Sequence, residues 1–285
     1  MSAKFGPAGN SDSFKSLGYK SSLDIARIIS SLNLDCYEYQ CGRGVNISQQ
    51  KAEMLGQLCK EQNVALSIHA PYYISLASED EAKRDNSINY ILQSARAADY
   101  MGATRIVVHP GGKGKFTRQE AMSLALDTFK RSIKALDENN LGHIIICPET
   151  MGKINQLGDL DEIIEFCKCD ERVIPCIDFG HLNSRTFGSI KDKNDFAKII
   201  EKIENELGSY RAKNFHTHFS KIEWSQGGEV KHLTFEDVTF GPRFEPFIEY
   251  VLQKDLTPVV ICESAGTQAE DAKMMKDYYL SKGVN

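Results

Sequence analysis

The stretch "RIVVHPGG" (residues 105–112) sets the pattern by which the whole chain is interpreted. Residues 106–108 are β-branched and apolar, which is typical of a buried strand. His109 stands at the end of this run, and Pro110 with two glycines then breaks the chain into a loop. A titratable ring where an apolar strand ends needs an explanation, and the chain repeats the arrangement several times.

A short apolar run, a polar or glycine-containing loop and a helix follow one another along the chain. The eight strand candidates are "KFGPAG" (4–9), "CYEYQ" (36–40), "ALSIHAP" (65–71), "RIVVHPG" (105–111), "HIIICPE" (143–149), "IPCIDFG" (174–180), "NFHTHFS" (214–220) and "PVVICES" (258–264). Between them apolar residues recur with helical spacing. Eight such units predict an α/β fold, a (β/α)8 TIM barrel forming a single domain over residues 1–285. A doubly wound open sheet is the alternative, although no GxGxxG or GxxxxGK[ST] motif supports it.

Composition indicates a globular protein without a membrane segment. No run approaches the ~18 apolar residues that a membrane helix needs, and the N-terminus does not resemble a signal peptide, so we expect a cytoplasmic protein. The eight cysteines include no CxxC pair, which favours reduced thiols. The net charge of −5 argues weakly against a nucleic-acid partner, but three bound Zn²⁺ ions would bring it to about +1.

Polar side chains stand at the C-terminal ends of the third to eighth predicted strands, where the active site of such a barrel lies. They are His69, His109, Glu149, Asp178, His181, His216 and Glu263, and His232 follows in the loop after the seventh strand. Converging carboxylates repel one another unless a cation is present. Imidazoles mixed with carboxylates are ligands of Zn²⁺, Mn²⁺ or Fe, so this set predicts a metal centre.

The size of the set predicts more than one ion. A single octahedral ion would need about four protein ligands plus water, so the set indicates two or three ions. We expect Zn²⁺, with Mn²⁺ or Fe²⁺ as alternatives, and Glu149 is placed in strand order to bridge two ions. His218 shares a face with His216, but we prefer His216 as the ligand. His143 precedes its strand and is assigned to the opposite, structural end of the barrel.

The motifs resemble, in order and spacing, the endonuclease IV family of abasic-site repair nucleases, which are zinc-dependent (β/α)8 barrels. The matching motifs are "HAPY" (69–72), "HPG" (109–111), "ETMG" (149–152), Asp178-x-x-His181, "HxxxSK" (216–221) and the glutamate of "CES" (262–264). The resemblance covers about residues 65 to 265. It implies an endonuclease of base excision repair that acts on damaged double-stranded DNA.

The resemblance also implies a role for each residue. His69, His109 and Glu149 would hold a first zinc, Glu149, Asp178, His216 and Glu263 a second, and His181 and His232 a third. A hydroxide between the first two ions would attack the phosphorus 5′ to an abasic sugar, and the third ion would stabilise the leaving 3′ oxygen. We assign catalysis to Glu149 and Glu263. Tyr72 matches a position that contacts distorted DNA, and we expect Arg43 and Lys221 to bind the substrate as well.

Several positions depart from the family pattern, and we interpret the chain as a divergent branch. The family's third metal uses an Asp-x-His pair, but Val230 stands where that aspartate belongs. We therefore hypothesise that Glu229, one residue earlier, is the ligand instead. The loop "QCGRGVN" (40–46) is shorter than the family's DNA-probing loop and offers only Arg43. "FGPAGN" (5–10) also replaces the usual Gly-x-His-x-Ser pattern.

Two other functions are consistent with the sequence. Sugar isomerases and epimerases of the xylose-isomerase-like superfamily use a Glu, Asp, His, Glu quartet around one ion, which Glu149, Asp178, His216 and Glu263 resemble. Such an enzyme does not need the additional histidines, which favours the nuclease. The third function is a binding protein that kept the metals but lost DNA engagement, as the short loop and the acidic charge would allow.

Basic residues on the predicted active rim offer contacts to phosphate. They are Lys113, Lys115, Arg118, Arg185 and Lys221. Trp224, in the predicted loop 220–232, either stacks on a base or packs beneath its loop. We expect the protein to be a monomer.

Overall fold

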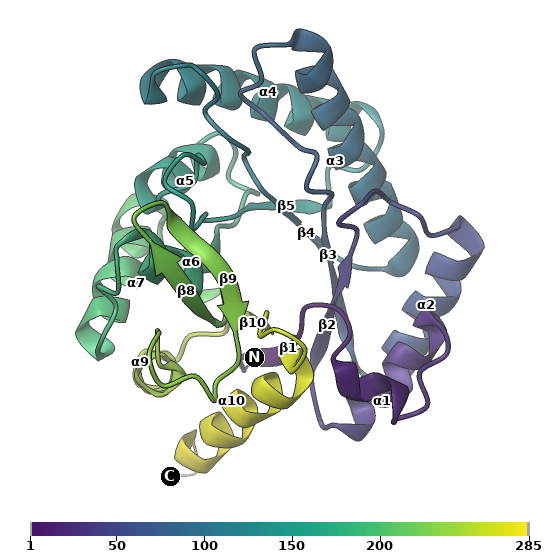
Figure 1. The fold of residues 1–285 in the computed structure, drawn as a ribbon. Helices are drawn as coiled ribbons and strands as arrows, with labels where there is room; N and C mark the ends of the chain where they lie inside the picture. The colour runs from purple at the N-terminus through teal and green to yellow at the C-terminus, as the bar shows by residue number, and fades with distance from the viewer. Residues whose placement is uncertain (1, 284–285) are drawn as a thin grey trace.

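Eight parallel strands form a barrel with helices around it in the computed structural model, which describes residues 2–283 (Figure 1). The strands are β1 (Lys4–Pro7), β2 (Cys36–Gln40), β3 (Ala65–His69), β4 (Arg105–Val108), β5 (Ile145–Pro148), β6 (Cys176–Asp178), β7 (His216–Phe219) and β10 (Val259–Cys262). Each lies within one of the eight predicted strand segments. The predicted (β/α)8 barrel is therefore confirmed, and the open-sheet alternative is wrong.

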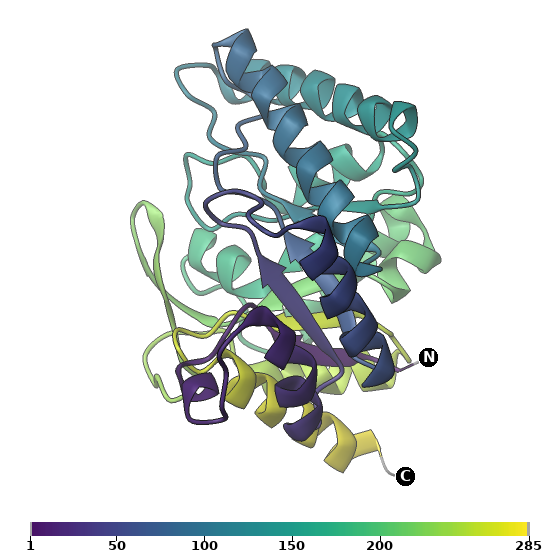
Figure 2. The ribbon, with the colours of Figure 1, turned by 90° about the vertical axis from the view of Figure 1, so that its right-hand side faces the viewer.

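Two four-stranded sheets make up the barrel wall, in the orders β1-β10-β7-β6 and β2-β3-β4-β5. Single bridges join them, from Ala8 to Glu38 beside β1 and β2 and from Glu149 to Cys176 beside β5 and β6. All neighbouring barrel strands are parallel, so their C-terminal ends open on one side. The N-terminus lies toward the opposite side (Figure 2).

The helices form the outer layer, and several of them begin at a residue whose side chain caps the helix. They are α1 (Ile25–Ser31), α2 (Gln49–Glu61), α3 (Glu81–Met101), α4 (Arg118–Glu138), α5 (Leu160–Cys167), α6 (Phe179–Arg185), α7 (Lys193–Leu207), α8 (Ser209–Lys213), α9 (Phe244–Gln253) and α10 (Gln268–Gly283), with short 3₁₀ turns at Asp12–Lys15 and Ser22–Asp24. Thr117, Asp159 and Asp192 form capping boxes at α4, α5 and α7. The α3 helix ends at Gly102, whose φ of 65° suits glycine.

A hairpin after β7 is the main element that the sequence analysis did not predict. It consists of β8 (Lys221–Ser225) and β9 (Gly228–Leu233), which pair antiparallel where a loop was expected. It projects beyond the barrel on the side where the parallel strands end (Figure 2). The hairpin therefore forms one wall of whatever site lies at that end.

Apolar side chains fill the space between the barrel and the helices. Phe179, Phe196, Phe219 and Phe247 form one aromatic cluster there, with ring centroids 4.9 to 6.4 Å apart, and all four are buried. Burying one such side chain stabilises the fold by about 1.5–3 kcal/mol. The eight cysteines are free thiols, in line with the expected reduced state.

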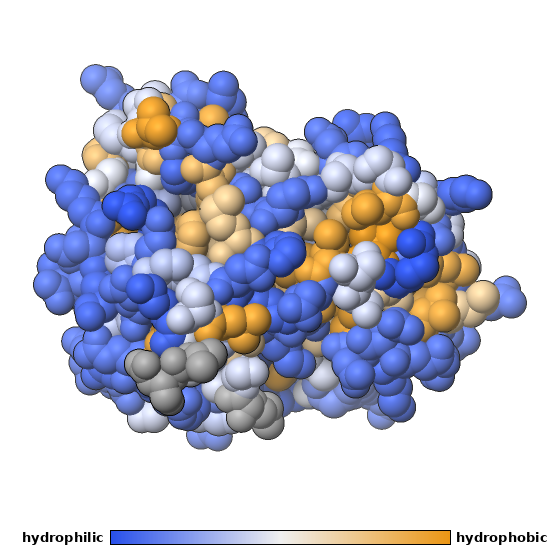
Figure 3. Space-filling model, turned by 90° about the horizontal axis from the view of Figure 1, so that it is seen from below, coloured by the Kyte–Doolittle hydropathy of each residue, from blue (hydrophilic) through white to orange (hydrophobic). Residues whose placement is uncertain are grey.

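The lower face of the molecule is mainly hydrophilic (Figure 3). Seen from below, the molecule shows hydrophilic side chains interrupted by separate hydrophobic patches (Figure 3). Across residues 2–283, no helix is both long enough and apolar enough to cross a membrane.

Candidate metal centre

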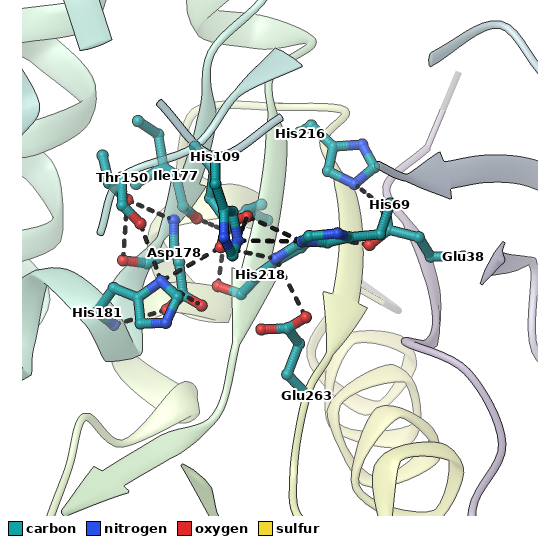
Figure 4. Close-up of polar contacts among 12 residues, drawn as sticks. Glu38, His69, His109, Thr150, Ile177, Asp178, His181, His216, His218 and Glu263 are labelled. Atoms are coloured by element: carbon teal, nitrogen blue, oxygen red, sulfur yellow. Dashed lines mark hydrogen bonds and ion pairs between the residues drawn. The ribbon is translucent and has the colours of Figure 1, made fainter. Parts of the chain in front are cut away.

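Histidines and carboxylates from most of the barrel strands meet at the end where those strands finish (Figure 4). They surround a cavity of about 830 Å³, whose lining includes His69, His109, His181, Glu229, His232 and Glu263. Four groups of ligand-type side chains meet here, some of which share residues; the fourth consists of the buried Cys176, His216 and His218. Different strands and loops position each group.

The first group consists of His69, His109 and Glu149, at the ends of β3, β4 and β5. The His69 and His109 Nε2 atoms lie 3.1 Å apart and 3.3 and 2.9 Å, respectively, from Glu149 Oε2. His69 Nδ1 lies 2.8 Å from the Ala70 carbonyl oxygen, which can only accept a hydrogen bond. Nδ1 therefore carries the proton, and the Nε2 lone pair of His69 is available for a cation.

The second group contains Glu149, Asp178, His218 and Glu263. His218 Nδ1 lies 3.1 Å from Glu149 Oε1 and 3.4 Å from Glu263 Oε1. Asp178 caps helix α6, because its Oδ1 accepts a hydrogen bond of 2.7 Å from the His181 backbone N–H. Its other oxygen, Oδ2, lies 3.2 Å from His181 Nδ1. One carboxylate oxygen each of Asp178, Glu149 and Glu263 and one nitrogen of His218 lie within 4.8 Å of one another, which places three carboxylates around one imidazole.

The third group consists of His181, Glu229 and His232, from α6 and the hairpin. Glu229 Oε2 lies 3.4 Å from His181 Nε2, and its Oε1 lies 3.9 Å from His232 Nε2. His181 Nδ1 is 2.9 Å from the Thr150 carbonyl oxygen, so Nδ1 carries a proton and Nε2 is the nitrogen that faces Glu229 and can bind a cation. The structure thus brings Glu229 to the place that the sequence analysis hypothesised for it, while Val230 is half exposed on the hairpin.

Two buried carboxylate oxygens support metal binding independently of the sequence motifs. Glu149 Oε2 and Asp178 Oδ2 are buried and accept no hydrogen bond of good geometry, although His109 Nε2 lies 2.9 Å from the first oxygen and His181 Nδ1 lies 3.2 Å from the second. A buried carboxylate oxygen without a donor costs free energy, and a bound cation removes that cost. Imidazole and carboxylate groups together are ligands of divalent transition metals such as Zn²⁺, Mn²⁺ and Fe²⁺, so the donor set fits ions of this class.

The positive charge of the histidines balances the negative charge of the buried carboxylates at this site. Burial raises the pKa of Asp178 to about 6, although His181 opposes the shift. Burial also acts to raise the pKa of Glu263, but the nearby His218 outweighs it and holds that pKa at about 2. Burial acts to lower the pKa of His218, yet the surrounding acidic groups leave that pKa well above its usual value. Metal binding should therefore release protons from these imidazoles.

The structure corrects the choice between the two histidines of β7. His216 was expected in the second group, but His218 occupies that place and His216 lies one layer deeper. Both side chains point into the barrel, because residues two apart in a strand share a face. His216 Nε2 instead lies 2.9 Å from Glu38 Oε2, and burial lowers the pKa of His216 to about 4.

Glu38 on β2 is a polar residue of this region that the sequence analysis missed. It is fully buried inside the barrel, between His216 and His218. The available signal was its place in "CYEYQ", where it is the one charged residue of a buried strand. A charge at such a position is rare unless it is paired.

Two of the three expected substrate-binding residues lie at the cavity. Arg43 and Tyr72 both line it, and the Tyr72 ring lies 5.4 Å from the His69 ring and 5.5 Å from the His109 ring. Lys221 does not line it, because its ammonium donates hydrogen bonds to the Phe235 and Asp237 carbonyl oxygens. Substrate binding by Lys221 therefore lacks support from its position.

The arginines expected to contact phosphate are engaged within the protein. Arg118 makes a two-pronged ion pair with Glu162 and donates to the Ile154 carbonyl oxygen. Arg185 donates to carbonyl oxygens of the same 151–156 loop. Both guanidinium groups thus hold in place the loop after β5 that borders the metal centre.

The remaining candidates also have partners within the protein. Lys113 donates to the Phe116 carbonyl oxygen, and Lys115 is exposed near Glu79. Trp224 packs against Phe187, which follows α6, with ring centroids 5.7 Å apart. This contact agrees with packing inside the protein, one of the two roles considered for Trp224. His143 is exposed away from the centre, in agreement with its structural assignment.

The fold and the site together define a (β/α)8 barrel protein that gathers histidines and carboxylates at the C-terminal ends of its strands. Residues 26–278 match the xylose isomerase-like TIM barrel family, and the chain belongs to this family. The family thus agrees with the barrel that the sequence predicts.

Relatives in this family include nucleases. The chain is 33% identical over 212 residues to a probable endonuclease 4 of Mycoplasma pneumoniae, which covers 72% of this chain and 70% of that protein. It is 34% identical over 251 residues to an uncharacterized protein of Methanocaldococcus jannaschii, covering 88% of this chain and 89% of that one. The endonuclease IV resemblance therefore holds at modest identity.

Solved structures with this fold come from two kinds of enzyme. Endonuclease IV from Thermus thermophilus superposes with a TM-score of 0.63 at 14% identity, covering 92% of this chain and 93% of that one. A D-tagatose 3-epimerase-like protein superposes with a TM-score of 0.72 at 21% identity, covering 98% of both chains. At these identities the likeness shows the fold alone.

Proposed function

We propose that this protein is a zinc-dependent endonuclease that hydrolyses the DNA phosphodiester 5′ to abasic sites. The observation that carries the proposal is the arrangement of three ligand groups around Glu149. Its Oε2 faces His69 and His109, while its Oε1 lies 3.2 Å from His181 Nδ1 and 3.1 Å from His218 Nδ1. One carboxylate therefore connects neighbouring groups, as a bridging ligand must.

The additional groups distinguish this site from that of a single-ion enzyme. The quartet of Glu149, Asp178, His218 and Glu263 would suffice for one ion. The His69–His109 pair and the group of His181, Glu229 and His232 would then have no role. Two or three ions, by contrast, are the usual means of cleaving a phosphodiester bond.

Metal ions bound here would supply an activated water nucleophile and positive charge on the phosphate oxygens. The protein's own groups fix where that chemistry occurs. Glu149 and Glu263 both face His218 Nδ1 and would hold the ion of the second group. The backbone of α6 fixes Asp178 through its capping hydrogen bond. Tyr72 and Arg43 lie at the cavity, where an aromatic face and a guanidinium suit an unstacked nucleotide and its phosphate.

The proposed substrate is damaged double-stranded DNA. The hairpin and the loop after β2 form two walls of the cavity, through Glu229 and Arg43. We expect the protein to act as a monomer in the cytoplasm. The acidic net charge does not oppose DNA binding once zinc is bound, because three Zn²⁺ ions would carry about six positive charges into the cavity.

A sugar epimerase that uses a single ion is the second candidate. The observation in its favour is the quartet of Glu149, Asp178, His218 and Glu263, whose ligand atoms lie within 4.8 Å of one another. These four residues could hold one ion without help from the other groups. A carbonyl held by that one ion, flanked by Glu149 and Glu263, would allow proton transfer between carboxylates and substrate. The relevant difference from the nuclease is the number of ions needed for activity.

The two candidates are separated by one pair of assays on the same preparation. The zinc-loaded protein is incubated with a duplex containing one abasic-site analogue, and separately with a ketohexose such as tagatose. A single nick 5′ to the lesion that disappears on prolonged chelation supports the nuclease. Epimerisation without nicking, from protein verified to hold its metals, would overturn it in favour of the epimerase.

A further inference from the structure

A second polar layer lies inside the barrel directly beneath the metal centre (Figure 4). Its central group is the Glu38 carboxylate, which is fully buried. Glu38 Oε2 accepts a hydrogen bond of 2.8 Å from Ser67 Oγ and lies 2.9 Å from His216 Nε2. Glu38 Oε1 lies 3.0 Å from His218 Nε2.

His218 connects this layer to the metal centre through its two ring nitrogens. Nε2 faces Glu38, whereas Nδ1 faces Glu149 and Glu263 in the second ligand group. Both ring nitrogens of His218 face carboxylates, and an ionised carboxylate can only accept hydrogen bonds, so both nitrogens carry a proton before a metal binds. When a cation takes the place of the Nδ1 proton, Nε2 keeps its proton toward Glu38 and the Nδ1 lone pair points at the cation.

The cost of burying Glu38 calls for a function. An ionised carboxylate inside a barrel costs several kcal/mol unless its partners compensate for it. Burial acts to raise the pKa of Glu38, but His218 and His216 outweigh it and hold that pKa well below its usual value. An apolar side chain would fill this core position at lower cost.

We propose that Glu38 is a positioning residue that fixes the ring orientation and tautomer of His218, so that Nδ1 is presented to a metal ion. The proposal rests on the metal centre described under the proposed function. His216 and Ser67 occupy the other carboxylate oxygen and hold Glu38 in place. A hydrogen-bonded carboxylate behind a ligating histidine typically changes metal affinity 10- to 100-fold.

The test compares metal binding by E38Q and by the control H216N. The amide of E38Q keeps the volume but loses the charge that favours a proton on His218 Nε2. We expect E38Q to bind the ion of the second group about 10- to 100-fold more weakly in a chelator competition. H216N removes the neighbour on the other oxygen and should leave that affinity nearly unchanged, since Ser67 still holds Glu38.

Cobalt substitution supplies a readout that a merely structural role would not change. With Co²⁺ in place of zinc, E38Q should alter the visible absorption bands of the second-group ion and leave those of the His181, Glu229 and His232 group unchanged. Identical spectra and affinities for E38Q and the unmodified protein would overturn the proposal. Neither measurement needs DNA, so a failure of the nuclease proposal is recognised separately.

A measurement on the unmodified protein decides the matter if E38Q does not fold. In the zinc-loaded protein, ¹⁵N NMR of the imidazoles should show His218 protonated at Nε2 and metal-bound at Nδ1. Metal on Nε2 would contradict the proposal. So would an additional zinc lost in C176S, because Cys176, His216 and His218 would then form a metal site of their own.

Discussion

Both ends of the barrel place a histidine beside a carboxylate, but the pair at the N-terminal end is exposed and the pair at the C-terminal end is buried. At the N-terminal end, His143 Nε2 lies 2.9 Å from Asp99 Oδ1, and the two side chains are 58% and 43% exposed. At the C-terminal end, His69 and Glu149 approach to 3.3 Å with exposures of only 2% and 0%. The first pair is open to water, whereas the second pair is almost completely buried at the base of the cavity that His69 lines.

This difference indicates which charges have a function. An exposed ion pair contributes about 0–1 kcal/mol and needs no further explanation. Buried carboxylates that keep one oxygen without a hydrogen bond, such as Glu149 and Asp178, are unfavourable without a cation. Substitutions at one end of the barrel at a time should therefore have very unequal effects.

The largest effect is expected from E149Q, which removes the carboxylate shared by the first two groups. Its amide cannot bridge two cations, so the variant should lose the ions of both groups. The rate of abasic-site nicking should fall by about 10³-fold or more, since several kcal/mol of charge stabilisation are lost. Zinc per chain and the nicking rate measure this, and full metal content with an unchanged rate would refute the bridging role.

Glu229→Ala should have the next largest effect. It removes the carboxylate between His181 and His232, so the third ion should be lost while the other two remain. The nicking rate should fall by about 10²-fold, as for the loss of one charge-stabilising group. Val230→Ala is the matched control on the neighbouring residue and should retain all ions. Equal metal content in the two variants would show that Glu229 is not a ligand.

Zinc removal should destabilise the fold through the C-terminal end alone. At free zinc about 100 times its dissociation constant, binding adds about 2.7 kcal/mol to the free energy of unfolding. Thermal unfolding with zinc and with a chelator measures this difference. In E149Q the zinc-dependent shift should be much smaller. A shift of full size in E149Q would place the stabilising ions elsewhere.

The smallest effect is expected at the N-terminal end. H143A should change the free energy of unfolding by no more than about 0.5 kcal/mol, because its partner Asp99 stays solvated. Zinc content and nicking should match those of the unmodified protein. A loss of zinc in H143A would mean that the distinction between the two ends is wrong.

The barrel could be predicted from sequence because most strands, such as Arg105–Val108 and Val259–Cys262, contain a short apolar run that ends in a loop. The hairpin β8–β9 could not, since Lys221–Ser225 and Gly228–Leu233 are mixed in polarity and pair only with each other. Hydrophobic periodicity carries no signal for such a solvent-facing ribbon. Its position nevertheless decides where Glu229 lies.

The metal ligands were predictable as a set but not in every member. His216 and His218 point to the same side of β7, so the alternation of side chains along the strand cannot tell which of them lies close enough to Glu149 to join the metal centre. Arg118 is the first residue of α4 and Arg185 the last residue of α6, and only the tertiary structure shows that the 151–156 loop engages them. Glu38 pairs with residues 178 and 180 positions away, a contact that no local pattern reveals.

The central claim is that the C-terminal end of this barrel holds several ions rather than one. The most direct test is the zinc content of the purified protein, saturated with zinc and then freed of loosely bound metal, measured by elemental analysis. The three ligand groups predict about three zinc ions per chain. One zinc per chain, unchanged in Glu229→Ala, would contradict the account and favour a single-ion epimerase.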